Sequence, residues 1–248
     1  MNDPRSVAHE PDTTLVSVRE AVFDLLRSFK MTTVFGNPGS TELPFLDRWP
    51  DDFRYVLGLQ EASVVGMADG YARATGRPAF CNLHSAAGVG HALGNIYNAY
   101  RNQTPLVISA GQQSRSLLPM NPFLGASDAA SFPKPYVKWS AEPARGEDVP
   151  QAIAHAYQIA TQRPYGPTLV SIPFDDWQAR TRRVPPRVVM SDIAADPKAI
   201  ESVAHALNES RRPVIVAGAE IDQDGAGDAM VALAERLAAP VWAAPFAS

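Results

Sequence analysis

The sequence has only one cysteine, Cys81, so neither a disulfide nor a cysteine-based metal cluster can form within the chain. None of its apolar runs is long enough to span a membrane, and the polar N-terminus lacks the apolar core of a signal peptide. Long basic runs are also missing, and the net charge of −4 argues against a nucleic-acid partner. We therefore expect a soluble, cytoplasmic protein in which Cys81 is a buried core residue.

A regular alternation of strand-like and helix-like segments runs through the first two thirds of the chain. Apolar, β-branched stretches predict six strands, at residues 32–35, 53–59, 79–83, 105–110, 136–139 and 167–173. Amphipathic segments lie between most of them, and the first begins at Ser17 and Glu20, which have capping-box spacing. The alternation predicts an α/β fold with a doubly wound, parallel, six-stranded sheet.

The composition changes after Trp177. Residues 178–195 begin with a polar, basic, proline-bearing stretch, which predicts a linker between a domain at 15–177 and a second one at 196–248. Residues 1–14 are expected to form a flexible tail. The second segment supplies one βαβ unit, and a two-stranded parallel sheet leaves a face and both edges bare. We therefore expect an incomplete second α/β domain, and hence a fragment of a longer protein.

Two polar residues follow neighbouring strands of the predicted sheet. Glu61 comes after the strand at 53–59, and His84 comes directly after the strand at 79–83. Ligands bind open α/β sheets at the carboxyl ends of the strands, where the GNPGS segment at 36–40 also lies. A first-turn glutamate or a strand-end histidine alone is as easily structural. The convergence of three βα junctions is what favours a ligand site.

Several interpretations of that site stay open from the residues alone. Gly88, Gly90 and Gly94 resemble a dinucleotide fingerprint, but three residues instead of two separate the last pair, and no acidic residue ends the next strand. Ser40, His84 and Glu61 suggest a hydrolase triad, but the G-x-S-x-G elbow is missing. A noncatalytic α/β binding module is the third alternative.

Five segments together resemble the pyrimidine-binding domain of the thiamine diphosphate-dependent enzymes: FGNPGSTELPFL, LGLQEASVVGMADGYARATGRPAF, NLHSAAGVGHALGNIYNAY, PLVISAGQQSR and GPTLVSIPFDDW. The resemblance covers residues 17–177 and is closest to the benzoylformate decarboxylase group. It implies a carbon–carbon lyase that converts an aryl 2-oxo acid to an aldehyde and CO2, as in mandelate breakdown. The rival within the family is an acetolactate synthase-like carboligase, a group that typically lacks a histidine at the position of His84.

The resemblance also implies roles for single residues. Glu61 would contact N1′ of the cofactor's aminopyrimidine and so help to activate the thiazolium ring. His84 would transfer protons to and from the reacting adduct. Ser40 would bind the carboxylate of the substrate. Asn37 and Gly39 would lie beside the cofactor.

Other implied positions depart from the family pattern. Phe123 and Leu124 align with apolar residues that line the substrate pocket, although Phe123 replaces a smaller aliphatic residue. Ser131, Phe132 and Lys134 match a loop that holds a metal ion partly through backbone carbonyls. A neutral polar residue is expected where this chain has a histidine, His91.

The family binds its diphosphate through Mg²⁺, with ligands in a C-terminal domain that has no counterpart here. Its sites form between subunits, so the resemblance implies a homo-oligomer, at least a dimer and in the decarboxylases a homotetramer. The expected partner is a small 2-oxo acid. From the missing half of the site we predict that the 248-residue chain alone is inactive.

Overall fold

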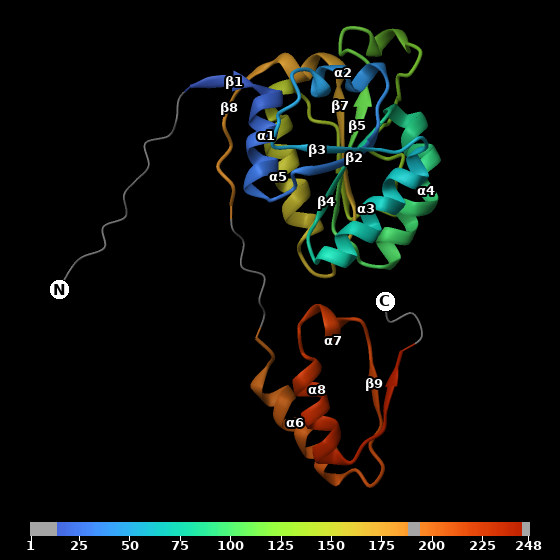
Figure 1. The fold of residues 1–248 in the computed structure, drawn as a ribbon, viewed down its shortest axis with the longest axis vertical. Helices are drawn as coiled ribbons and strands as arrows, with labels where there is room; N and C mark the ends of the chain where they lie inside the picture. The colour runs from blue at the N-terminus through green and yellow to red at the C-terminus, as the bar shows by residue number, and fades with distance from the viewer. Residues whose placement is uncertain (1–13, 188–193, 245–248) are drawn as a thin grey trace, which may run out of the picture. The chain divides into compact units, whose positions relative to one another are not determined.

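The computed structural model describes residues 14–187 and 194–244, which divide into two compact units at Val189 (Figure 1). The predicted tail lies outside the described residues except for Thr14, as does the stretch 188–193 of the predicted linker. Within the two described ranges, no helix combines the length and the apolarity needed to cross a membrane. The predicted domain boundaries stay predictions.

The first unit is built on one six-stranded sheet. Its strands lie in the order β3-β2-β4-β5-β7-β6, and every neighbouring pair is parallel. Their bounds are Thr33–Asn37 for β2, Arg54–Leu57 for β3, Ala79–Leu83 for β4, Leu106–Gln112 for β5, Trp139–Ala141 for β6 and Thr168–Pro173 for β7. The predicted parallel sheet is confirmed, and only β6 is shifted by about one strand length towards the C-terminus.

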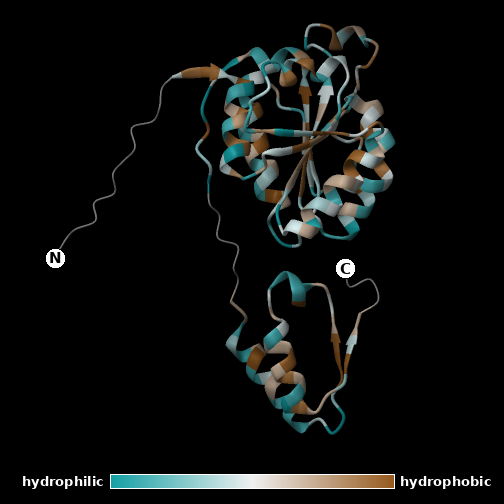
Figure 2. Cartoon of the chain, in the orientation of Figure 1, coloured by the Kyte–Doolittle hydropathy of each residue, from teal (hydrophilic) through white to brown (hydrophobic). Residues whose placement is uncertain are grey.

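Helices cover both faces of this sheet, as the doubly wound prediction requires. On one face lie α1 (Val18–Ser28) and α5 (Val149–Ala160), and on the other lie α3 (Glu61–Thr75) and α4 (Ser85–Arg101) (Figure 1). Apolar segments run along the central strands, while polar stretches follow the outer sides of the helices (Figure 2). Because both faces of β4 are covered, all five of its residues are buried.

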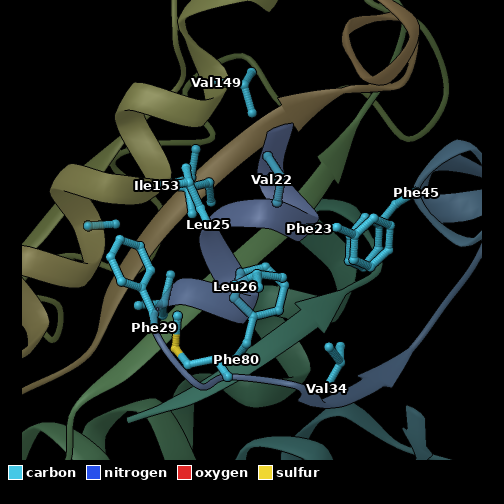
Figure 3. Packing of buried hydrophobic residues seen from close by; sticks show 14 of the residues in the cluster. Val22, Phe23, Leu25, Leu26, Phe29, Val34, Phe45, Phe80, Val149 and Ile153 are labelled. Atoms are coloured by element: carbon cyan, nitrogen blue, oxygen red, sulfur yellow. The ribbon is translucent and has the colours of Figure 1, made fainter. Parts of the chain in front are cut away.

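The core under α1 and α5 is rich in aromatic side chains. Phe23 stacks on Phe45 with ring centroids 5.1 Å apart (Figure 3). Phe53 meets Phe23 edge-on at 4.9 Å. Phe45 belongs to the short helix α2 (Leu43–Leu46), so this packing fixes the segment directly after the 36–40 loop. The core on the other face includes Cys81, where burial raises the pKa of the thiol. The expectation of a buried, structural cysteine is confirmed.

The N-terminus of α1 carries the predicted capping box. The backbone N–H of Ser17 donates to Glu20 Oε2 at 2.8 Å, and that of Glu20 donates to Ser17 Oγ at 3.2 Å. We expect Ser17→Ala to lower the free energy of unfolding by about 1 kcal/mol, because the backbone N–H of Glu20 loses its side-chain acceptor. Urea unfolding measures this. Ser28→Ala, at the other end of α1, is the control and should change stability less, so equal losses would contradict the capping role.

A second, antiparallel sheet was not predicted. It pairs β1 (Leu15–Ser17) with β8 (Arg180–Arg182), a three-residue strand inside the stretch that is predicted as linker. Arg180 and Arg182 are exposed and only Thr181 is buried between them. The strand is therefore stabilised by main-chain pairing with β1 and has no apolar run that would reveal it in the sequence.

The second unit contains the predicted βαβ arrangement. Its elements are α6 (Pro197–Glu209), β9 (Ile215–Ala217), α7 (Glu220–Gln223), α8 (Gly227–Leu237) and β10 (Val241–Ala243). β9 and β10 pair in parallel, and the short α7 is the one element that was not expected. Of the residues described in this unit, Ala234 alone is buried. That this is an incomplete domain stays a prediction.

Candidate active site

The three βα junctions named in the sequence meet at one edge of the sheet. β2 lies between β3 and β4, so the segments that follow these strands are neighbours. Gly39, after β2, packs directly on the ring of His84, since a Cβ at Gly39 would lie 2.3 Å from His84 Nδ1 and Cε1. Glu61 packs on Gly88, where a Cβ would lie 3.0 Å from Glu61 Oε1. His84 and Gly88 lie at the two ends of the first turn of α4, so the two predicted site residues, His84 and Glu61, both lie beside that turn.

Glu61 is the first residue of α3 and its side chain is only 8% exposed. Gln60 caps this helix, with its side-chain oxygen accepting from the backbone N–H of Ser63 at 3.2 Å. Within the described ranges, the hydrogen-bond partner of the Glu61 carboxyl is His91, whose Nδ1 lies 3.2 Å from Oε2. The His91 side chain is 64% exposed. The Glu61 carboxyl is thus buried, and its partner His91 is open to solvent. A carboxyl with a single partner has further hydrogen-bonding capacity for a ligand.

His84 is the N-cap residue of α4 and is partly buried, with 22% of its side chain exposed. Its Nδ1 lies 2.8 Å from Glu42 Oε2 and 3.2 Å from Thr41 Oγ1. Glu42 is 1% exposed and was not identified from the sequence. The available signal was its spacing three residues after Gly39, since its Oε2 accepts from the Gly39 backbone N–H at 2.8 Å as in a capping box.

The backbone turns sharply where His84 meets α4. Ser85, the next residue, is buried and has φ of +51°, in the left-handed region that side-chain-bearing residues rarely adopt. Such conformations cost about 1–3 kcal/mol and cluster at functional sites. The helix begins at Ser85, three residues before Gly88. The glycines that resembled a dinucleotide fingerprint therefore lie inside α4, and Gly88 faces a carboxyl group instead of a phosphate.

The remaining residues proposed for cofactor and substrate lie in the loop after β2. Asn37 is the last residue of β2 and is half-buried. Ser40 begins the short 3₁₀ turn η1 (Ser40–Glu42) and is exposed. It directly follows Gly39, the residue that packs on the His84 ring. The roles of Ser40 and Asn37 stay predictions.

The long irregular segment after β5 is held at one point by Gln112. Its side-chain oxygen accepts from Ala126 N at 3.0 Å, and its amide nitrogen donates to Ala126 O at 2.9 Å. Between these residues, Phe123 is 87% exposed and Leu124 is half-buried with φ of +67°. The pocket-lining role of both residues stays a prediction, and Phe123 as placed is open to solvent.

The loop proposed for a metal ion forms successive turns. The Ser131 N–H donates to Asp128 O at 3.1 Å, and the Lys134 N–H donates to Ser131 O at 3.0 Å. Phe132 is 46% exposed and faces Gly90 of α4. Across the parts of the chain that the structure describes, no group of three or more histidine, cysteine, aspartate or glutamate residues could hold a metal. The metal site proposed at Ser131, Phe132 and Lys134 would use backbone carbonyls instead of such side chains, and it stays a prediction.

Comparison with known proteins adds independent information. Residues 16–132 match the family described as thiamine pyrophosphate enzyme, N-terminal TPP binding domain, and residues 200–248 match the central domain of the same enzymes. The benzoylformate decarboxylase of Pseudomonas aeruginosa is 48% identical over 236 residues, which cover 94% of this chain and 45% of that protein.

Two further relatives differ in their degree of similarity to this chain. The crystal structure of benzoylformate decarboxylase from Polynucleobacter necessarius has a TM-score of 0.90 and 48% identity, covering 93% of this chain and 44% of that one. A probable acetolactate synthase large subunit from Methanocaldococcus jannaschii is 29% identical over 231 residues, 90% of this chain and 39% of that protein. The chain therefore spans less than half the length of the relatives it matches.

Proposed function

This chain belongs to the thiamine pyrophosphate enzymes, of which it carries the N-terminal TPP-binding domain and residues of the central domain, and on that premise we propose its activity. We propose that it is the N-terminal portion of a decarboxylase that converts an aryl 2-oxo acid, such as benzoylformate, to an aldehyde and CO2. The support is the 48% identity to benzoylformate decarboxylase together with a histidine held at the site.

The observation that carries the proposal is the buried carboxyl of Glu61 at a strand-to-helix junction. Gly88 leaves the space that this carboxyl occupies, and His91 is its hydrogen-bond partner within the described residues. The site fits the aminopyrimidine ring of thiamine diphosphate, since a carboxyl can hold a proton shared with a ring nitrogen. When bound, the cofactor supplies a nucleophilic carbon and an electron sink for the loss of CO2.

The other residues bind substrate and move protons around that group. Ser40, an exposed residue directly after Gly39, donates a hydrogen bond from its hydroxyl to the substrate carboxylate. His84 takes up and returns a proton at one ring nitrogen, and Gly39 keeps the backbone close to the imidazole. Asn37 and Gly39 border the cofactor, while Phe123 and Leu124 form part of the substrate pocket.

Further parts of the proposal follow the family resemblance. They are Mg²⁺ at the diphosphate with ligands in a further domain, a homo-oligomer of at least two subunits, and a cytoplasmic location. No step of the chemistry is assigned to the ion. The 248-residue chain alone is proposed to be inactive, and turnover by the purified chain would contradict this.

The test uses the complete enzyme, meaning this chain within its proposed longer protein, with thiamine diphosphate and Mg²⁺. We expect benzoylformate to yield benzaldehyde and CO2, quantified by chromatography and CO2 release. Pyruvate is the discriminating substrate, because acetolactate formation without benzaldehyde would favour the carboligase. Isothermal titration should show binding of thiamine diphosphate and none of NADH, and the absence of cofactor binding would favour a noncatalytic module.

A further inference from the structure

We propose that Glu42 is a positioning residue that fixes His84 in the tautomer with its proton on Nδ1, so that Nε2 is the nitrogen that exchanges protons at the reaction centre. The inference rests on the proposed function, because it specifies how His84 performs the proton transfer assigned to it. It begins from the carboxylate–imidazole contact of 2.8 Å between Glu42 Oε2 and His84 Nδ1.

The hydrogen bonds around Nδ1 determine which tautomer forms. The Thr41 hydroxyl donates its one proton to Glu42 Oε1 at 2.6 Å, so its oxygen can only accept from Nδ1, 3.2 Å away. Glu42 Oε2 already accepts a hydrogen bond from the Gly39 N–H at 2.8 Å, and an ionised carboxylate oxygen can accept a second hydrogen bond. Both oxygens next to Nδ1 are therefore acceptors, and the ring nitrogen between them must carry hydrogen.

The carboxylate has little freedom to rearrange. A Cβ at Gly111 of β5 would lie 1.8 Å from Glu42 Oε1, and one at Gly39 would lie 2.3 Å from the His84 ring. Gly111 thus brings backbone against the carboxylate, and Gly39 brings backbone against the imidazole. Tyr55 of β3 is the other titratable group nearby, and burial, followed by the negative charge of Glu42, raises its pKa.

A buried carboxylate that orients an imidazole and selects its tautomer contributes to catalysis without touching the substrate. Glutamine in its place would allow both tautomers. Its carbonyl oxygen can accept from Nδ1–H, or its amide can donate to Thr41 while the Thr41 hydroxyl donates to Nδ1. Thr41→Val removes the hydroxyl and leaves the carboxylate, so it should preserve the Nδ1–H tautomer. These two variants separate the role of Glu42 from that of Thr41.

The direct test is nitrogen NMR on the histidine-labelled 248-residue chain at a pH where the imidazole is neutral. The sequence contains five histidines, and His84→Gln assigns the relevant signals. We expect wild type and Thr41→Val to show a protonated Nδ1 and an unprotonated Nε2, and Glu42→Gln to show averaged signals. A proton on Nε2 in wild type, its appearance there in Thr41→Val, or an unchanged Glu42→Gln spectrum would each overturn the proposal.

A matched control is the exposed pair in α6, where His205 Nε2 lies 3.3 Å from Glu209 Oε1. Glu209→Gln should alter the His205 signals alone. In the complete enzyme, Glu42→Gln should lower kcat by about tenfold, less than the roughly 10²–10⁴-fold that a general acid–base group itself contributes, with little change in KM. If wild type has no decarboxylase activity, the proposed function fails while the NMR result still stands. If Glu42→Gln does not fold, the wild-type and Thr41→Val spectra decide.

Discussion

Replacing Glu61 by glutamine in the complete holoenzyme should lower kcat/KM about 10²–10⁴-fold, the range that a positioned acid–base group contributes. Glutamine has nearly the same size and can fill the space beside Gly88, but it cannot exchange a proton with a ring nitrogen. The carboxyl is 8% exposed, so water cannot easily substitute for it. Steady-state decarboxylation at saturating thiamine diphosphate and Mg²⁺ measures the loss.

The control for this substitution is Glu20→Gln. Glu20 also stands in the first turn of a helix, but its carboxylate belongs to the exposed capping box of α1. We expect it to reduce stability and leave turnover unchanged. Cofactor affinity should be measured for both variants by titration calorimetry, since the turnover of Glu61→Gln must be compared with that of wild type when both are saturated with cofactor. Normal turnover by saturated Glu61→Gln would refute the assigned role.

The site at the carboxyl ends of the strands could be predicted because short sequence patterns mark where each strand ends. β4 is a continuous buried strand, so its end and the residue that follows, His84, can be read from apolar character alone. The same applies to Glu61 at the start of α3, where the change from strand to helix marks the junction. Parallel strands bring such junctions to one edge, and this topological rule needs no knowledge of side-chain packing.

Glu42 could not be predicted in the same way. It lies in a 3₁₀ turn of three residues, which is too short to show a periodic pattern. Its partner His84 is 42 residues away in the sequence, and their contact depends on how two loops pack. β8 was missed for a related reason, because its pairing with β1 joins residues far apart in the sequence, such as Val16 and Thr181.

The contact between Gly39 and His84 leads to the second large effect. Gly39→Ala places a Cβ 2.3 Å from the imidazole, closer than any non-bonded contact allows, so the ring or the loop must shift. A displacement of about 1 Å at a catalytic group can cost about 10²-fold in rate, and we expect a loss of kcat of that order. Overpacking should also lower the free energy of unfolding by about 1–3 kcal/mol.

The matched control is Gly70→Ala, since no atom would lie within 4 Å of a Cβ at that position in α3. Alanine there should keep full activity and slightly raise stability, because glycine disfavours helix. Gly39 is also proposed to border the cofactor, so cofactor affinity must be determined alongside the rate. A loss of kcat with unchanged affinity and altered His84 nitrogen signals would locate the effect at the imidazole. Wild-type kcat in Gly39→Ala would mean that the position of His84 does not limit the reaction.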